Sequence, residues 1–172
     1  MKRKVCEVIL IIVFYVLQTT FFKAISIAGI SANIMIILPV VFGYFNGKRE
    51  GIFVGLISGL MYDIYYSSVF GFSSLVFMYA GYVSGIFHRD FDTTRIIIPM
   101  VLTAVSDFTY EFLMYIGNFL LHNKLNVTFY LRRIIIPELI YTLIVFALMF
   151  RMLEYLNKKF KPKERKSVQE SA

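Results

Sequence analysis

The chain has 172 residues, 58% of them from the hydrophobic set AVILMFWYC, and its mean hydropathy is +0.69. Soluble domains are about 45–50% apolar even when glycine is included, so this composition excludes an ordinary soluble domain and indicates a membrane protein. The net charge of +7 follows the membrane topology described below and does not indicate a nucleic-acid partner. A single cysteine, Cys6, excludes an internal disulfide.

Six apolar blocks follow one another along the chain. A helix needs about 20 residues to cross a hydrocarbon layer of about 30 Å, and several of the blocks are that long. We therefore predict an all-α fold, a polytopic membrane bundle of about six transmembrane helices. Their expected ranges are 5–22, 31–46, 51–66, 69–87, 95–121 and 130–156. The second and third are short and rich in glycine, so a re-entrant pair is the competing topology.

The predicted spans make up one transmembrane domain, residues 1–156, and residues 157–172 make up a basic cytoplasmic tail that we expect to be disordered. The opening sequence MKRK and the apolar run after it resemble a signal peptide. No small-residue cleavage site follows that run, so we expect it to stay in the protein as the first span.

The basic residues are distributed unevenly between the two sides of the predicted spans. Fourteen of the 18 Lys and Arg residues fall on the side of the two termini, and four fall on the other side. Because cytoplasmic loops carry the excess of positive charge, both termini are predicted to lie in the cytoplasm. The tail sequence KKFKPKERK is either a solvated flank of the last span or a segment attracted to anionic lipid.

Several common catalytic motifs are absent from the sequence. It has no glycine-rich phosphate loop ending in Lys-Ser or Lys-Thr, no G-x-S-x-G elbow and no H-E-x-x-H pair. No cluster of Cys and His has the spacing of metal ligands. We predict that the protein is not an enzyme and that it holds neither a cofactor nor a metal.

The third span carries a stripe of glycines at Gly51, Gly55 and Gly59. Residues four apart lie on one face of a helix, so these glycines predict a flat groove along one side of the span. In lipid, such small-residue stripes let two helix backbones approach closely, and a partner helix is therefore expected there. It belongs either to another protein or to this chain, where Gly81 and Gly85 of the fourth span form a similar stripe.

Four acidic residues fall within predicted spans or at their edges: Asp63, Asp107, Glu111 and Glu138. An acid inside a bilayer costs several kcal/mol unless it is paired, protonated or next to water, so each residue is a candidate functional group. A helix rise of about 1.5 Å per residue places all four toward the outer half of the membrane.

Asp107 and Glu111 stand four residues apart and share one helix face, where like charges repel. A proton, a cation, water or an arginine is therefore needed nearby. Arg132 and Arg133 precede the sixth span on the same side and are candidate ion-pair partners for Glu138 or for this pair. Two interpretations stay open: the acids satisfy one another and nearby backbone inside the bundle, or they line a polar cavity that opens outward.

The spacing of several of these residues resembles a known family. The pattern G-x-x-x-G-x-x-x-G-L-x-x-D-x-x-x-x-x-x-x-G runs from Gly51 through Leu60 and Asp63 to Gly71. It is similar to the central signature of the bacterial rod shape-determining MreD family. The length of the chain, the Gln18-Thr19 end of the first span and the basic tail also fit. The second span departs from the family pattern, because it begins with Ala32-Asn33 where the family often has Pro-Asp.

The resemblance implies a non-enzymatic component of the cell-elongation complex, placed as a multi-pass protein in the bacterial cytoplasmic membrane. Its implied partners are membrane lipids and an MreC-like membrane-anchored periplasmic protein. Through that protein it would reach the actin-like MreB and the peptidoglycan synthases, and no nucleic acid is expected. The family implies a fold resembling the substrate-binding membrane subunits of energy-coupling-factor transporters.

That likeness also gives an alternative function, a transporter subunit that captures a small molecule and borrows an external ATPase. Such a subunit should carry an alanine-x-x-x-alanine docking motif in its first span, and the sequence VCEVILIIVFYV has none. A third interpretation, a carboxylate-based membrane enzyme, would require turnover that depends on Asp107 or Glu111.

Overall fold

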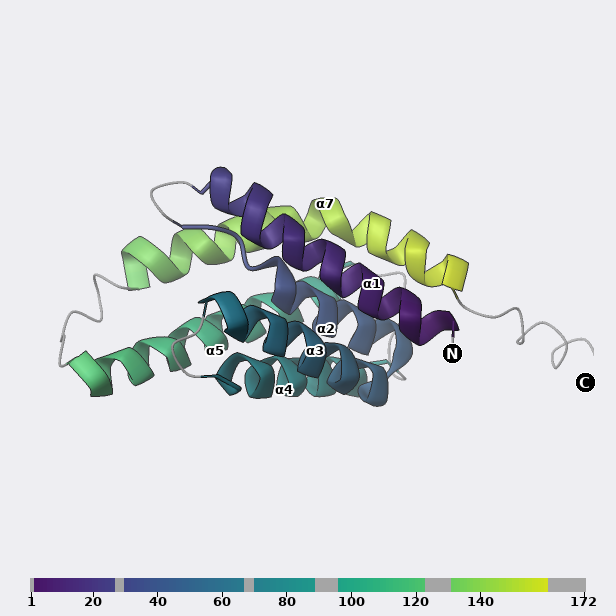
Figure 1. Cartoon of the computed structure of the whole chain (residues 1–172), viewed down its shortest axis with the longest axis horizontal. Helices are drawn as coiled ribbons and strands as arrows, with labels where there is room; N and C mark the ends of the chain where they lie inside the picture. Colours follow the sequence, from purple (N-terminus) through teal and green to yellow (C-terminus); the bar gives the residue numbers. More distant parts are fainter. Residues whose placement is uncertain (1, 27–29, 67–69, 89–95, 123–130, 161–172) are drawn as a thin grey trace, which may run out of the picture.

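The computed structural model describes residues 2–26, 30–66, 70–88, 96–122 and 131–160. Over these residues the chain forms six α-helices and two π-helical segments, which run roughly along one long axis (Figure 1). They are α1 (Lys2–Leu17), η1 (Gln18–Phe22), α2 (Ile34–Asn46), α3 (Lys48–Tyr66), α4 (Phe72–Ile86), α5 (Ile97–His122), η2 (Leu131–Ile135) and α7 (Ile136–Phe160). The prediction of an all-α membrane bundle is confirmed. The last helix runs past its expected end at 156, and the predicted tail from 161 onward lies outside the described residues.

Three stretches of the described chain are long and apolar enough to cross a membrane: Lys4–Phe22, Ile97–Gly117 and Leu131–Lys158. The helices α2 and α4 have 13 and 15 residues and are shorter than the roughly 20 that a span requires. The six helices that the sequence predicts are therefore present, but only three of them cross by their own length and composition. The middle of the bundle explains the difference.

The helix α2 forms the centre of the protein. Every residue from Ile34 to Phe45 is buried, and α2 contacts α1, α3, α4, α5 and α7. A helix that is apolar on all sides belongs inside a protein rather than at its surface. Because protein surrounds α2, the thickness of the lipid layer does not set its length.

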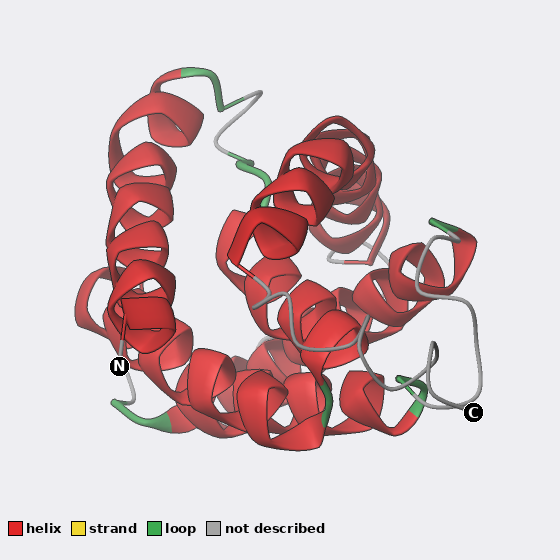
Figure 2. Ribbon diagram, turned by 90° about the vertical axis from the view of Figure 1, so that its right-hand side faces the viewer, coloured by secondary structure: helices red, strands yellow, loops and turns green. Residues whose placement is uncertain are grey.

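The helices α3 and α4 pack most closely of all the pairs, and both lie against α2. The hydroxyl of Ser84 in α4 donates to the carbonyl of Val40 in α2 at 2.6 Å, which ties these two elements together. Gly47 alone separates α2 from α3, and its φ of 94° allows the abrupt reversal of the chain. The end-on view of Figure 2 shows helices joined by loops, and no described residue belongs to a β-strand.

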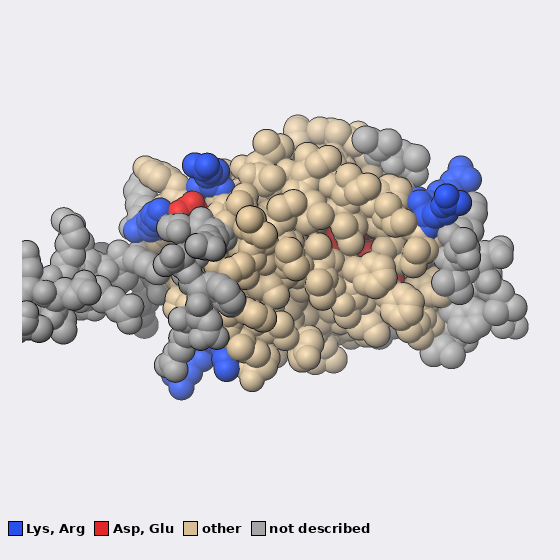
Figure 3. Space-filling view, turned by 180° about the vertical axis from the view of Figure 1, so that it is seen from behind, with Lys and Arg blue, Asp and Glu red and all other residues tan. Residues whose placement is uncertain are grey.

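Lys and Arg side chains gather at the two ends of the molecule, and a largely apolar band, in which some acidic atoms are visible, separates them (Figure 3). One end, here called the basic end, brings together the start of α1, the start of α3 and the end of α7 (Figure 1). The other end, the far end, carries Lys23 and the exposed Arg132 and Arg133. Large apolar side chains are exposed along α1, α5 and α7 between the two ends. This distribution suits a protein whose middle contacts lipid.

Candidate functional site

The glycine stripes of α3 and α4 face each other in the structure. A Cβ atom added to Gly51 would lie closer than 3.0 Å to the carbonyl of Gly81, and the reverse also holds. A Cβ on Gly43 of α2 would also overlap the carbonyl of Gly81, so the backbones of α2, α3 and α4 converge at this point. At the basic end, a Cβ on Gly85 would overlap the backbone of Lys48. Only glycine allows these approaches, because the atoms in the way are backbone and cannot rotate aside.

The contact continues along the two helices toward the far end. A Cβ on Gly55 would overlap the carbonyl of Phe77, and one on Gly59 would overlap the backbone of Ser74. Close van der Waals contact is what holds helices together in lipid, so the stripe is expected to contribute strongly to the stability of the bundle. In this structure the groove is filled by α4, a helix of the same chain.

Asp63 lies at the end of this stripe and caps the first turn of α4. Its side chain is only 2% exposed. The carboxylate accepts hydrogen bonds from the backbone N–H groups of Gly71 at 2.9 Å, Ser73 at 3.1 Å and Ser74 at 3.2 Å. These donors belong to the start of a helix, where they have no partner within the helix and where the helix dipole favours a negative charge. The acid that the sequence places next to lipid is thus satisfied by backbone.

Gly71 makes this cap possible. It has a φ of 93°, in the left-handed region, and directly precedes α4. A side chain would be strained there, although no atom lies within 4 Å of an added Cβ. The signature residues from Gly51 to Gly71 therefore build one structural unit, the α3–α4 hairpin.

A group of tyrosines connects this hairpin to α5. The ring of Tyr62 stacks on Tyr66 at 4.6 Å and meets Tyr110 edge-on at 5.8 Å. The hydroxyl of Tyr110 lies 3.1 Å from the hydroxyl of Ser73, next to the Asp63 cap. Tyr110 is 2% exposed and stands on α5 between two of the acids that the sequence singles out.

Those two acids and a third form a separate group, the acid cluster, defined as Asp107, Glu111 and Glu138. Asp107 is 1% exposed, Glu111 is 8% exposed and Glu138 is half-buried. Asp107 and Glu111 stand one turn apart on α5, and Glu138 in the first turn of α7 lies close enough to interact with them electrostatically. The helices α5 and α7 bring them together, and Asp63 is occupied by the cap described above.

The buried amide of Asn33 adjoins the acid cluster. Asn33 precedes α2, is fully buried, and donates its backbone N–H to the hydroxyl of Thr142 at 3.1 Å. The side chains of Asn33 and Thr142 lie close enough to the Asp107 carboxyl to interact with it. Within the described part of the chain, neither oxygen of Asp107 and neither polar atom of the Asn33 amide has a hydrogen-bond partner. Buried polar groups are normally satisfied, and the side chains of Asn33 and Thr142 are the neighbours that can donate to Asp107.

The candidate ion-pair partners lie at the far end. Arg132 and Arg133 are part of η2, and their side chains are exposed. Glu138 follows in the first turn of α7. An ion pair between these arginines and the acid cluster stays a prediction.

Gln18 is a second buried polar residue near the far end. Its amide donates to the carbonyl of Ala32 and accepts from the N–H of Ile34, both at 2.9 Å. The backbone carbonyl of Gln18 accepts a hydrogen bond from the hydroxyl of Tyr66 at 3.2 Å. Gln18 therefore connects η1, the start of α2 and the end of α3. In the sequence, Gln18 and Asn33 stand out only as parts of the family pattern. Their position at the ends of apolar blocks is the signal that could have indicated a structural role.

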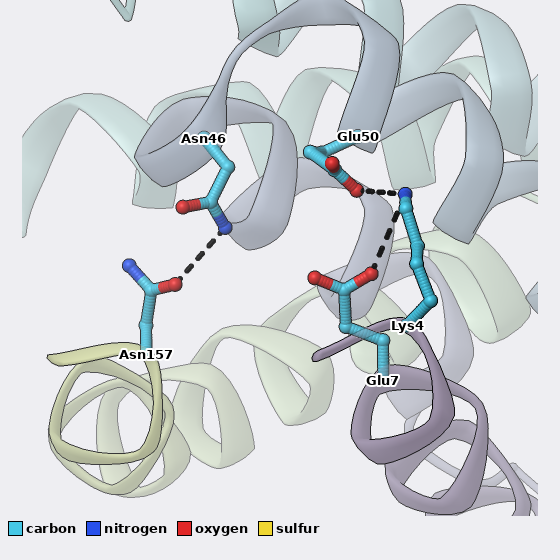
Figure 4. A network of polar contacts seen from close by, with 5 residues as sticks. All are labelled: Lys4, Glu7, Asn46, Glu50 and Asn157. Atoms are coloured by element: carbon cyan, nitrogen blue, oxygen red, sulfur yellow. Dashed lines mark hydrogen bonds and ion pairs between the residues drawn. The ribbon is translucent and has the colours of Figure 1, made fainter. Parts of the chain in front are cut away.

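The basic end has its own polar network, which sequence reasoning did not identify (Figure 4). Lys4 of α1 binds Glu50 of α3 and lies 3.6 Å from the carboxylate of Glu7. The amide of Asn46 at the end of α2 donates to Asn157 of α7 at 3.0 Å. These contacts tie the start of α1 to the start of α3, and the end of α2 to the end of α7. The Lys4–Glu50 and Asn46–Asn157 contacts join residues on different helices. No local sequence motif therefore identifies these contacts.

No metal centre is formed within the described ranges, in which no three His, Cys, Asp or Glu side chains converge closely enough to hold an ion. A family model described as rod shape-determining protein MreD matches residues 1–160. No curated protein and no solved structure matches the chain. The likeness to subunits of energy-coupling-factor transporters therefore stays a prediction.

Proposed function

Because the chain belongs to the MreD family of rod shape-determining proteins, we propose that it is a non-enzymatic component of the complex that elongates the bacterial cell wall. Family membership gives the chain a role in rod shape determination and places it in a membrane. The finer role in our proposal is to bind an MreC-like partner and, through it, to help organise MreB and the peptidoglycan synthases.

The family match over residues 1–160 carries this proposal. The geometry supports it, because the signature residues serve packing and capping. Gly51, Gly55 and Gly59 hold α3 against α4, and Asp63 orients the first turn of α4. A rigid bundle with a large apolar surface suits a protein that supports partners in the membrane.

The proposed topology places both termini in the cytoplasm. The basic end carries Lys4, Lys48, Arg49 and Lys158, in agreement with the excess of positive charge on cytoplasmic loops. Cysteine labelling tests it in a Cys6→Ser background. A cysteine replacing Lys158 should react with a membrane-impermeant reagent only after the cells are opened, and one replacing Lys23 should react in intact cells. The reverse pattern would contradict the topology.

The function is tested by depleting the protein in its source cell and purifying it with bound partners. We expect depleted cells to become round, with wall synthesis no longer confined to its normal sites, and we expect an MreC-like protein to copurify. Normal rods after complete depletion would contradict the proposal. Copurification of an ATPase module together with a retained vitamin would instead favour the transporter subunit, which the buried polar side chains around Asp107 make the second candidate.

A further inference from the structure

The start of α3 and the outward side of α4 form a continuous surface at the basic end. The two helices touch there backbone to backbone, because a Cβ atom on Gly85 would overlap the backbone of Lys48. The ammonium group of Lys48 extends over the ring of Tyr82, with 5.4 Å between the nitrogen and the ring centroid. Arg49 follows in α3, and its side chain is also exposed. Two cationic side chains therefore lie at this end of the hairpin, and one of them reaches over α4.

The outward side of α4 is apolar and aromatic. It carries four exposed side chains spaced four, three and four residues apart, here called the α4 face: Leu75, Tyr79, Tyr82 and Ile86. This spacing keeps the four residues on one side of a helix. Leu75 and Tyr79 are 67% and 68% exposed. Because α2, α3 and α5 pack against the rest of α4, the α4 face is the side that meets the surroundings of the protein.

The cations next to the α4 face are not used in the ion pairs of the basic end. Among the described residues, those pairs join Lys4 to Glu7, Lys4 to Glu50 and Lys158 to Glu154. Within the same residues, neither Lys48 nor Arg49 forms an ion pair. An anionic group from outside the chain therefore complements this surface without displacing an internal partner.

The length of the α4 face matches one leaflet of a bilayer. From Leu75 to Ile86 the helix rises about 16 Å, at about 1.5 Å for each residue. A hydrocarbon layer of about 30 Å gives about 15 Å to each leaflet. A partner helix that crosses the membrane would need about 20 residues, whereas one acyl chain covers a single leaflet. The length therefore favours a lipid over a transmembrane helix.

The charge disfavours a second copy of the chain on the same surface. Two copies inserted in the same direction would place Lys48 and Arg49 of both at one level of the membrane. Like charges that face each other across an interface oppose association. An anionic lipid carries the opposite charge at that level and an apolar chain below it.

From the charge and the length of this surface, we propose that the α4 face and the start of α3 bind an anionic phospholipid. The phosphate lies against Lys48 and Arg49, and one acyl chain lies along Tyr82, Tyr79 and Leu75. The site goes beyond the proposed function in cell elongation and does not depend on it. It is measured on the purified protein without any partner, so failure of one proposal leaves the other standing.

Native mass spectrometry of the full-length protein in detergent tests the preference for an anionic lipid. The protein is titrated in parallel with phosphatidylglycerol and with phosphatidylcholine of the same acyl chains, whose headgroup is zwitterionic. We expect the first phosphatidylglycerol to bind about 10- to 30-fold more tightly than the first phosphatidylcholine, which is up to about 1 kcal/mol for each basic residue. Equal affinities for the two lipids would overturn the proposal.

Two double variants connect the preference to the site. Lys48→Gln with Arg49→Gln should remove most of it, weakening phosphatidylglycerol binding about 10- to 30-fold. Arg151→Gln with Lys158→Gln is the matched control, since it removes two exposed charges from α7, which lies along the opposite edge of the molecule from α4 (Figure 1). The control should bind phosphatidylglycerol as tightly as the unchanged protein. An equal effect of both double variants would overturn the site, because binding would then follow only the total charge of the basic end.

Photolabelling locates the acyl chain on the unchanged protein, so the proposal stays testable if the first double variant does not fold. A phosphatidylglycerol with a diazirine in one acyl chain is bound to the protein and irradiated, and mass spectrometry identifies the labelled peptides. We expect the label mainly between Leu75 and Ile86 of α4. Label spread evenly over the exposed apolar sides of α1, α5 and α7 would overturn the proposal.

Discussion

Replacing Asp63 with alanine removes the acceptor of three buried backbone N–H groups and leaves the α3–α4 glycine contact in place. The donors belong to Gly71, Ser73 and Ser74, at 2.9–3.2 Å from the carboxylate. Because they form the first turn of α4, no carbonyl within the helix can replace the lost acceptor. The substitution therefore tests whether Asp63 is primarily a helix cap.

The size of the effect follows from these contacts. An N-cap substitution costs about 0.5–2 kcal/mol, and each buried donor left without a partner costs about 1–3 kcal/mol. Some of the three donors can reach water at the end of the hairpin, so we expect Asp63→Ala to lower the free energy of unfolding by about 2–4 kcal/mol. Asp63→Asn keeps an acceptor oxygen but loses the charge near the helix N-terminus, and about half of that loss is expected.

Unfolding in mixed micelles titrated with SDS, followed by circular dichroism, measures these free energies. Glu154→Ala is the control, since its exposed pair with Lys158 contributes at most about 1 kcal/mol. Hydrogen exchange adds a local measurement, and the amides of Gly71, Ser73 and Ser74 should exchange faster in Asp63→Ala. Equal stability of Asp63→Ala and Glu154→Ala, with unchanged exchange at the start of α4, would refute the capping role.

The other predictions use the same denaturation measurement or complementation of a depleted strain. Gly55→Leu should disrupt α3–α4 packing without changing membrane insertion, whereas Gly117→Leu should be tolerated because no atom lies within 4 Å of its added Cβ; equal stability would contradict the packing role. Lys4→Met and Glu50→Gln should be non-additive by about 0.2–1 kcal/mol in a double-mutant cycle, since the two residues form a partly exposed ion pair; additive losses would show that the pair does not couple. In cells, Asp63→Ala should complement less well than a substitution in the tail beyond 160, such as Glu164→Ala, and equal complementation would remove the functional case for Asp63.

Helix positions in this protein are determined largely by local sequence. The third predicted span, 51–66, corresponds to α3 at Lys48–Tyr66, and the fifth, 95–121, corresponds to α5 at Ile97–His122. Long apolar blocks form helices because a backbone in lipid has no other way to satisfy its hydrogen bonds. The four-residue spacing of the glycines likewise predicts their common face, since it depends only on helix geometry.

Which side chains meet one another depends on tertiary packing. Asn33 and Thr142 are 109 residues apart and adjoin the same carboxyl group of Asp107. The sequence could place Asp63 and Asp107 at similar depths, but it could not show that one caps a helix and the other lies in the acid cluster. Helix rotation and pairing decide that difference, and both depend on the close packing of the bundle around α2. The sequence by itself therefore determined the helices and their family, whereas only the tertiary structure separated the acid that caps a helix from the acids that lie between α5 and α7.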